Sequence, residues 1–125
     1  MEFCEVVEVQ PGIVGAFITQ FREKEDQITF NPKGKFYCCY YGEKIVGVIS
    51  TMETKNVMRV KSFYVKKEWR GKGIGTTMLN YVIATNTENK QMTAFASQKS
   101  LNIFKKKKFI VETEKKNNIK FLRRY

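Results

Sequence analysis

The most informative segment of the sequence reads Lys66-Lys67-Glu68-Trp69-Arg70-Gly71-Lys72-Gly73-Ile74-Gly75-Thr76. Glycines at alternate positions let a backbone turn tightly, approach a ligand closely and leave N–H groups unpaired. The β-rich run Val57–Val65 precedes this segment, and apolar residues at helical spacing follow it from Ile74 to Val82. A helix that begins at such a loop directs its orphan N–H donors and its positive dipole end at one point. The segment therefore predicts a strand–loop–helix cradle for an anion such as a diphosphate, with charge added by Arg70 and Lys72.

On both sides of this segment, runs of strand and helix periodicity follow one another. Strands are expected over Phe3–Val9, Lys35–Tyr41, Lys44–Met52, Val57–Val65, Gln91–Ala96, Phe109–Glu112 and Ile119–Leu122. Helices are expected from Pro11 to about Glu25, from Ile74 to Val82 and over Gln98–Lys107. Turn residues fill Asn31–Gly34, and no second helix is expected between residues 26 and 35. This order predicts a mixed α/β (α+β) fold, in a single compact domain over residues 1–125.

The first expected helix carries an apolar stripe at helical spacing. Ile13, Phe17 and Phe21 recur every four residues, with Val14 and Ile18 beside them. We expect this stripe to face the core.

Composition excludes several classes of protein and site. The sequence has no histidine, which removes Ser-His-Asp and Cys-His nucleophiles and any histidine general base. Neighbouring Cys38 and Cys39 point to opposite faces of a strand, and the third cysteine, Cys4, completes no metal-ligand spacing. Reduced thiols, a cytoplasmic location and no metal site are expected. No apolar run reaches the roughly 20 residues that cross a bilayer, so no membrane association is expected.

The charge is large and unevenly distributed. Residues 1–50 carry a formal charge of −2, whereas residues 51–125 carry +13. A field of this size attracts anions: a phosphate-rich cofactor, nucleic acid or an acidic protein. Codon bias would enrich lysine throughout the chain, so it accounts poorly for the difference between the halves.

Arg70-Gly71-Lys72-Gly73-Ile74-Gly75 resembles the (Q/R)-x-x-G-x-(G/A) motif of the GNAT N-acetyltransferases. The resemblance includes Val65 before the loop and covers nearly the whole chain in element order. Further along, residues 97–109 keep the outline of the family's second signature, N-x-x-A-x-x-x-Y-x-x-x-G-F. The resemblance implies a central mixed sheet with flanking helices, and acetyl-CoA as acyl donor.

Residue by residue, the resemblance implies a cofactor site. The backbones of Phe63, Tyr64 and Val65 would pair with the pantetheine arm. The diphosphate would lie on the amides of Arg70, Gly71, Lys72, Gly73, Ile74, Gly75 and Thr76. Ser97 would lie near the pantetheine, and the Phe104 ring near the cofactor sulfur.

The sequence departs from the family where acid–base chemistry is concerned. Phe104 stands where many members place a tyrosine that protonates the leaving thiolate, and phenylalanine has no proton to donate. The strand that often carries a glutamate carries Arg59 and Lys61 instead. These two cations are two residues apart, so they share one face of the strand. That face is either solvated or a site for an anionic acceptor. The general acid and base stay unassigned, with Glu53 and Glu68 as the nearest carboxylates in sequence.

Three functions are consistent with these residues. The first is acetyl transfer from acetyl-CoA to an amine acceptor that is anionic or part of an acidic macromolecule. The second is a GNAT-like protein that binds or modifies nucleic acid, although the sequence shows no interleaving of aromatic and basic residues. The third is a non-catalytic module that binds CoA or a protein partner.

Overall fold

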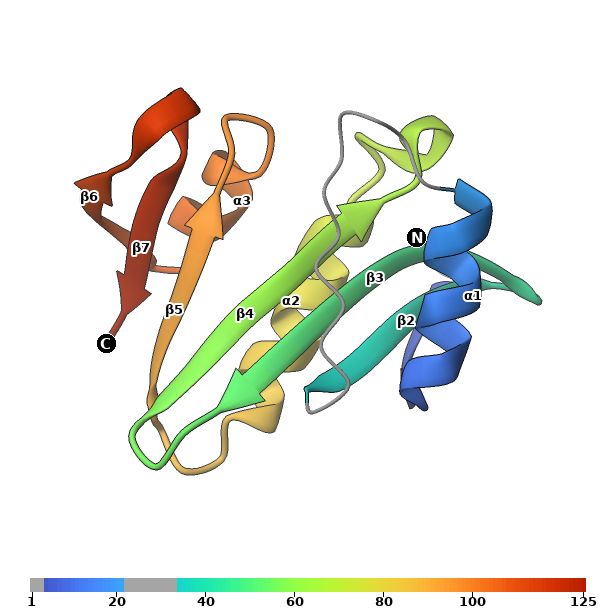
Figure 1. Ribbon diagram of the computed structural model, residues 1–125, viewed down its shortest axis with the longest axis horizontal. Coiled ribbons are helices and arrows are strands. Elements are labelled where there is room, and N and C mark those ends of the chain that lie inside the picture. Colours follow the sequence, from blue (N-terminus) through green and yellow to red (C-terminus); the bar gives the residue numbers. More distant parts are fainter. Residues whose placement is uncertain (1–3, 22–33) are drawn as a thin grey trace.

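One mixed sheet of seven strands organises the computed structural model, which describes residues 4–21 and 34–125 (Figure 1). The strands are β1 (Cys4–Val9), β2 (Lys35–Tyr41), β3 (Lys44–Glu53), β4 (Val57–Val65), β5 (Gln91–Ala96), β6 (Ile110–Glu114) and β7 (Lys120–Arg124). The helices are α1 (Pro11–Phe21), α2 (Ile74–Thr85) and α3 (Leu101–Lys106), with short 3₁₀ turns η1 (Lys67–Trp69) and η2 (Lys116–Asn118). The spatial order is β1-β2-β3-β4-β5-β7-β6, so the last strand lies inside the sheet and β6 lies at its edge.

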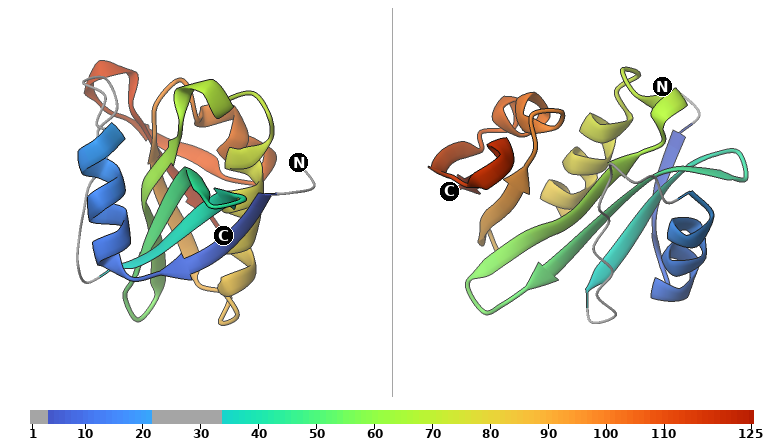
Figure 2. Two further views of the ribbon diagram at one scale, coloured as in Figure 1. Left: turned by 90° about the vertical axis from the view of Figure 1, so that its right-hand side faces the viewer. Right: turned by 45° about the horizontal axis from the view of Figure 1, so that its top comes forward.

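Helix α2 covers one face of the sheet, and α1 lies on the other (Figure 2). Met78, Leu79 and Val82 of α2 are fully buried and belong to one core cluster with Met58 of β4 and Met92 of β5. Because successive strand side chains point to opposite faces, the residues next to Met58 and Met92 project to the face opposite α2.

Helix α1 packs over β2 on that opposite face. Val14 and Phe17 are buried and form a second cluster with Phe36, Cys38 and Tyr64. Ile13, expected in the core, is 43% exposed, so this prediction was wrong. The buried line of the helix runs through Val14 and Phe17, and Ile13 lies beside it because neighbouring helical residues are about 100° apart.

The single parallel pairing between described strands opens the sheet. Strands β4 and β5 pair only over Val57–Val60 and Gln91–Ala94, and all other strand pairs are antiparallel. Beyond these residues β4 continues to Val65 beside β3, while β5 diverges from it beside β7 (Figure 1). Beyond Val60, no described strand pairs with this edge of β4, immediately before the glycine-rich loop.

The predicted fold class and element order are confirmed, with differences at the element boundaries. Helix α3 begins at Leu101 and not at Gln98, because the Ser97 carbonyl accepts from the N–H groups of Ser100 and Leu101 in a preceding turn. The final strands run to Glu114 and Arg124, two residues further than expected. The expectations for Phe3, the end of the first helix near Glu25, the turn at residues 31–33 and the absence of a second helix lie wholly or mostly outside the described residues.

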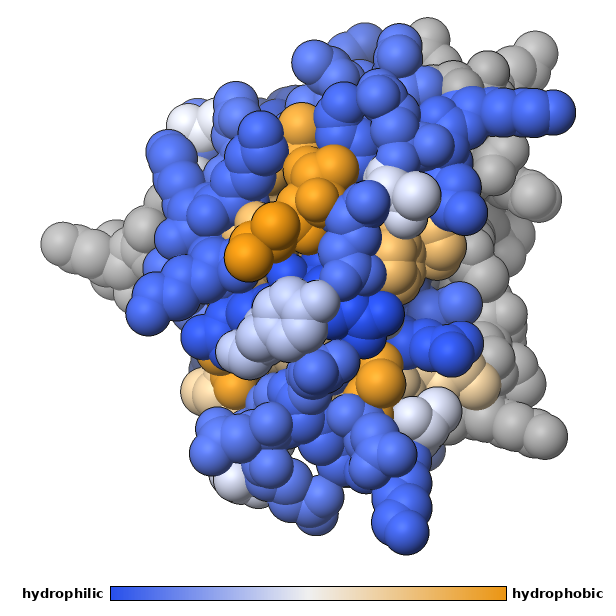
Figure 3. All heavy atoms as spheres, turned by 90° about the vertical axis from the view of Figure 1, so that its left-hand side faces the viewer, coloured by the Kyte–Doolittle hydropathy of each residue, from blue (hydrophilic) through white to orange (hydrophobic). Residues whose placement is uncertain are grey.

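The edge strand β6 is fully exposed. All five of its residues are solvent-accessible, including Ile110 and Val111. Figure 3 shows that apolar side chains on this side of the molecule occur in small groups separated by hydrophilic ones. Charged residues such as Glu112 and Glu114 interrupt the apolar edge, which disfavours strand-to-strand association.

Candidate functional site

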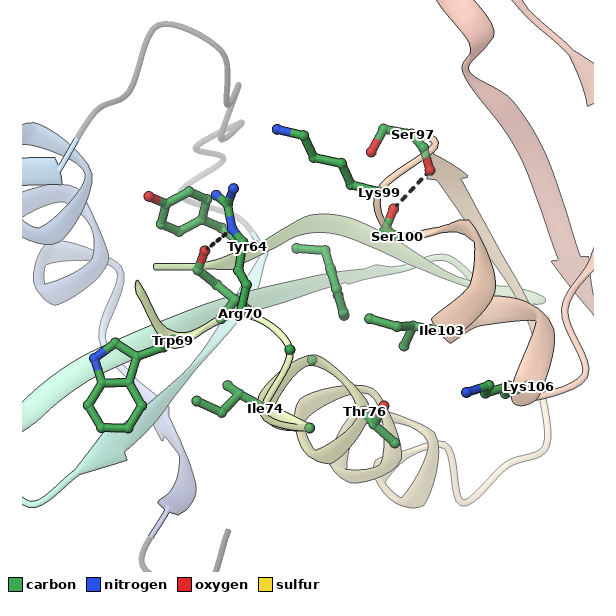
Figure 4. A pocket seen from close by; sticks show the side chains of 15 residues that line it. Tyr64, Trp69, Arg70, Ile74, Thr76, Ser97, Lys99, Ser100, Ile103 and Lys106 are labelled. Carbon is green, nitrogen blue, oxygen red and sulfur yellow. Dashed lines mark hydrogen bonds between the residues drawn. The ribbon is translucent and has the colours of Figure 1, made fainter. Parts of the chain in front are cut away.

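A pocket of about 420 Å³ lies where β4 and β5 diverge (Figure 4). Its lining consists of Phe63, Tyr64, Val65, Trp69, Arg70, Gly71, Gly73, Ile74, Gly75, Thr76, Ser97, Lys99, Ser100, Ile103 and Lys106. The structure thus brings together every residue expected at the cofactor site except Lys72 and Phe104. Strand β4, the glycine-rich loop and the start of α2 meet the segment around α3 across this pocket.

The loop reaches α2 through a left-handed backbone. Gly71 and Gly73 have φ values of 76° and 85°, a conformation that side chains with a Cβ rarely adopt. Gly73 is the N-cap of α2, and its carbonyl accepts the first helical hydrogen bond from Thr77 N at 3.0 Å. The N–H groups of the first helical turn have no partner within the helix, and Gly75 and Thr76 of that turn line the pocket. The loop therefore presents backbone donors and the positive end of a helix dipole.

The free edge of β4 offers further backbone groups. Lys66 N donates to Val46 O of β3 at 2.9 Å, so the backbone groups of Val65, one residue earlier, face away from β3. By the same alternation, the backbone groups of Phe63 face the opening and those of Tyr64 face β3. The Val65 carbonyl accepts a hydrogen bond from Arg70 Nε at 2.8 Å.

The lining is cationic. Arg70, Lys99 and Lys106 contribute positive charge, and no Asp or Glu occurs among the described lining residues. The nearest carboxylates in sequence point elsewhere. Glu68 is exposed beside Lys66, at 3.5 Å, and a backbone hydrogen bond together with the Lys66 charge lowers its pKa, which keeps it ionised. Glu53 lies 3.5 Å from Lys90 at the far end of β3.

Phe104 lies behind the pocket wall and not in the pocket. Its side chain is 1% exposed, and its ring centroid is 5.3 Å from that of Phe63 and 5.1 Å from that of Phe109. Of these three rings, only Phe63 belongs to the pocket lining. Lys72 is exposed on the outside of the loop.

The second pair of candidate residues lines a different surface. Arg59 and Lys61 belong to a groove of about 250 Å³ formed by β4, β5 and β7 on the face opposite α2. The register of β3 with β4 shifts between Ser50 and Thr51, so that Lys61 is an additional residue within β4. A β-bulge of this kind re-aims side chains, and both cations line the same groove.

Some lining residues of the pocket were not predicted. Trp69 directly precedes Arg70 in the glycine-rich segment. Lys99, Ser100, Ile103 and Lys106 come from the segment around α3, which only the tertiary structure brings to the opening. Lys106 lies in the basic run at the end of α3, for which the sequence leaves two explanations open: a favourable interaction with the helix dipole, or a phosphate contact with the cofactor or a nucleic acid.

The described residues contain no metal-binding cluster, and two of the three cysteine thiols are buried. Within residues 4–21 and 34–125, no group of His, Cys, Asp and Glu side chains could hold a metal ion. The three cysteines are free, and burial raises the pKa of Cys38 to about 11 and, with Cys4 nearby, that of Cys39 to about 12. None of the described helices is long and apolar enough to cross a membrane.

Comparison with solved structures shows the same fold in several acetyltransferases. The chain superimposes on an IAA acetyltransferase from Bacillus cereus with a TM-score of 0.76 at 16% identity, covering 97% of this chain and 98% of the other. For a GNAT family acetyltransferase from Elizabethkingia anophelis with acetyl-CoA bound, the TM-score is 0.73 at 16% identity over 99% of both chains. For a variant of the spermidine N-acetyltransferase SpeG from Vibrio cholerae, it is 0.76 at 9% identity over 98% and 94%.

Sequence comparison identifies the family. A search of curated protein sequences finds no significant match. The model of the acetyltransferase (GNAT) domain, however, matches residues 8–123, which include all elements from α1 to β6 and most of β7. The chain therefore belongs to the GNAT acetyltransferase family.

Proposed function

We propose that this chain transfers the acetyl group of acetyl-CoA to the amine of an anionic acceptor, in one domain that spans residues 1–125. One observation carries the proposal. The pocket between β4 and β5 combines a free strand edge, a glycine loop at a helix N-terminus and cations, with no carboxylate in its described lining. This donor set suits a long ligand with an amide-containing arm and a diphosphate.

The residues present fit each part of the cofactor. Backbone amides from Gly71 to Thr76 would hold the diphosphate. The outward-facing backbone groups of Phe63 and the N–H of Val65, whose carbonyl already accepts from Arg70 Nε, would pair with the pantetheine amides. Ser97 lies across the opening from β4, on the segment after β5. Support comes from the Elizabethkingia anophelis acetyltransferase, a protein of the same fold whose structure has acetyl-CoA bound.

Acetyl-CoA supplies a thioester whose C–S bond breaks as the acceptor nitrogen forms a C–N bond, and the proton lost by the amine balances the departing thiolate. The described pocket residues offer no carboxylate to take that proton, so the amine must arrive uncharged or lose its proton to water. Phe104 cannot supply a proton to the thiolate. The chain would therefore contribute mainly by holding two substrates in reactive geometry.

The charge of the second groove favours an anionic acceptor. Arg59 and Lys61 line it together with Arg123. A cationic polyamine would be repelled by these residues, and the 9% identity to a spermidine N-acetyltransferase indicates shared fold alone. The groove residues Lys61 and Phe95 are each two residues along the chain from Phe63 and Ser97, which line the first pocket.

Two neighbouring threonines provide a matched test. Thr76 lines the pocket, whereas Thr77 lies in the same helical turn, bonds Gly73 O through its hydroxyl at 2.9 Å and is not in the lining. A glutamate at either position is compatible with the helix N-terminus. Thr76→Glu should weaken acetyl-CoA binding by at least about tenfold through repulsion of the diphosphate, while Thr77→Glu should bind nearly as the wild type does.

Calorimetric titration of acetyl-CoA into both folded variants measures this difference. Thiol release with an amine panel then tests transfer. Equal affinity of the two variants would contradict the assignment of this pocket to the cofactor.

A further inference from the structure

The groove on the open sheet face combines one exposed and one half-buried aromatic ring with positive charge. Strand β4 contributes Arg59 and Lys61, β5 contributes Phe95, and β7 contributes Phe121 and Arg123. Their neighbours Met58, Met92, Ala94 and Leu122 lie in the core under α2. The groove therefore lies on the side of the sheet turned towards the viewer in Figure 1.

Phenylalanine side chains are usually buried, but one of the two in the groove is exposed to solvent. The side chain of Phe95 is 59% exposed, and its ring centroid lies 5.1 Å from that of Phe121 at an interplanar angle of 49°. The guanidinium carbon of Arg123 lies 5.7 Å from the Phe121 centroid. A second flat ring placed on Phe95 would bury apolar area that is now in contact with water.

Of the three cations in the groove, one is bound to neighbouring side chains and two are not paired with a described carboxylate. Arg123 donates to Glu112 Oε1 at 3.0 Å through Nε and to Gln91 Oε1 at 2.9 Å. Arg59 and Lys61 are exposed, and neither forms an ion pair with a described residue. An acid group entering beside Phe95 would therefore meet two cations whose charge no described carboxylate neutralises.

We propose that the acceptor is a small amine that carries both a flat ring and an acid group. This inference rests on the proposed function and specifies its acceptor. The ring lies against Phe95 and Phe121, the carboxylate or phosphate is bound by Arg59 and Lys61, and the amine points along β4 towards the cofactor pocket. The group transferred and the bonds exchanged are those of the acetyl transfer above.

The dimensions of the groove favour a small molecule over a nucleic acid. The groove has a volume of about 250 Å³ and a single pair of phenylalanine rings, so it accommodates one ring of a ligand. Proteins that bind single strands instead stack successive bases along an extended groove. Beyond Arg123 the surface carries Glu112, which also accepts a hydrogen bond from Tyr125 at 2.6 Å. Because Glu112 and Arg123 form an ion pair, this part of the surface adds no net positive charge for a phosphate backbone that continued across β7 to the sheet edge.

Three amines separate the contributions: 4-(aminomethyl)benzoate has ring and acid, benzylamine lacks the acid, and 5-aminopentanoate lacks the ring. Binding is measured on the full chain, without acetyl-CoA, from amide shifts in ¹H–¹⁵N spectra. The first compound should bind about tenfold more tightly than either other one. Phe95→Ala and Arg59→Glu should each abolish that advantage, whereas Lys116→Glu, the same charge reversal on an exposed residue outside the groove, should retain it.

Thiol release from acetyl-CoA with the same amines is the second measurement. The expected order of turnover follows the order of binding. Selective binding without thiol release would support the acceptor class and count against the transfer reaction itself. Thiol release with no preference among the amines, or selectivity unchanged in Phe95→Ala and Arg59→Glu, would overturn this inference and leave the transfer reaction standing. Arg59-dependent binding of a ten-nucleotide oligouridylate without binding of the aromatic acid would also overturn it, in favour of nucleic acid.

Discussion

Arg70 Nε donates a 2.8 Å hydrogen bond to the carbonyl oxygen of Val65, which ties the first residue of the glycine loop to the last residue of β4. The guanidinium carbon of Arg70 also lies 5.5 Å from the ring centroid of Tyr64. The same side chain therefore adds positive charge to the pocket and fixes the start of the glycine loop against the end of β4.

Arg70 should therefore matter for both the fold and the cofactor. Arg70→Ala removes a hydrogen bond worth about 1 kcal/mol, which denaturant unfolding should detect. It also removes a charge from the pocket, so acetyl-CoA affinity should fall by about tenfold. Arg70→Lys keeps the charge but not the guanidinium, so its affinity should lie between those of the wild type and Arg70→Ala. Lys67→Ala is the control, since Lys67 is exposed in η1 and outside the lining. Equal affinities for Arg70→Ala and Lys67→Ala would limit the role of Arg70 to the fold.

Restoring the hydroxyl that the family often has should not help this protein. Phe104 is enclosed by Phe63 and Phe109, so Phe104→Tyr places a hydroxyl in an apolar interior at a cost of about 1–3 kcal/mol. We expect lower stability and no increase in thiol release. Phe95→Tyr is the stability control, because its added hydroxyl reaches water and should leave stability nearly unchanged. Faster thiol release at unchanged stability would show that the Phe104 ring edge reaches the pocket.

The residue that follows the C-cap of α3, Lys108, could be replaced by one that stabilises the fold. Lys108 has a φ of 70°, and the next residue, Phe109, donates to Phe104 O at 3.2 Å, a helix end at which glycine is favoured. Lys108→Gly should raise the free energy of unfolding by about 0.5–1 kcal/mol. Lys105→Gly, inside the same helix, should lower it by about 1 kcal/mol. A loss of stability in Lys108→Gly would contradict the backbone geometry at this position.

The buried thiols predict a loss of stability at alkaline pH. Burial raises the pKa of Cys38 to about 11 and of Cys39 to about 12, from an ordinary value near 9. The fold therefore favours the neutral thiols, and their contribution is complete below pH 9 and decreases as the pH rises towards 11 and 12. Unfolding free energies from pH 8 to 10.5 should decline less steeply in a Cys38→Ala, Cys39→Ala variant than in the wild type.

Chemical modification gives an independent check on the thiols. At pH 8 iodoacetamide should label Cys4, which is half-buried, well before Cys38 and Cys39. Rapid labelling of all three thiols in the folded protein would contradict the burial of the two β2 cysteines.

The strand–loop–helix segment and the order of the elements were predictable because their signals are local. Gly71 and Gly73 mark a backbone conformation that few other residues adopt, and the periodicity on either side assigns β4 and α2. The fold class followed from that order alone. Ile13 shows what periodicity cannot predict: whether an apolar residue at helical spacing is buried also depends on where the sheet lies against the helix.

The lining of the pocket and of the groove depended on the tertiary structure. Strand β7 inserts between β5 and β6, and the parallel pairing of β4 with β5 stops at Val60, which together place Arg59, Phe95 and Arg123 around one groove. These residues are far apart in the chain, so no linear pattern joins the aromatic rings to the cations. The same reason applies to Phe104: a motif gives its place on a helix, but packing against Phe63 and Phe109 determines that its ring lies in the core and not in the pocket.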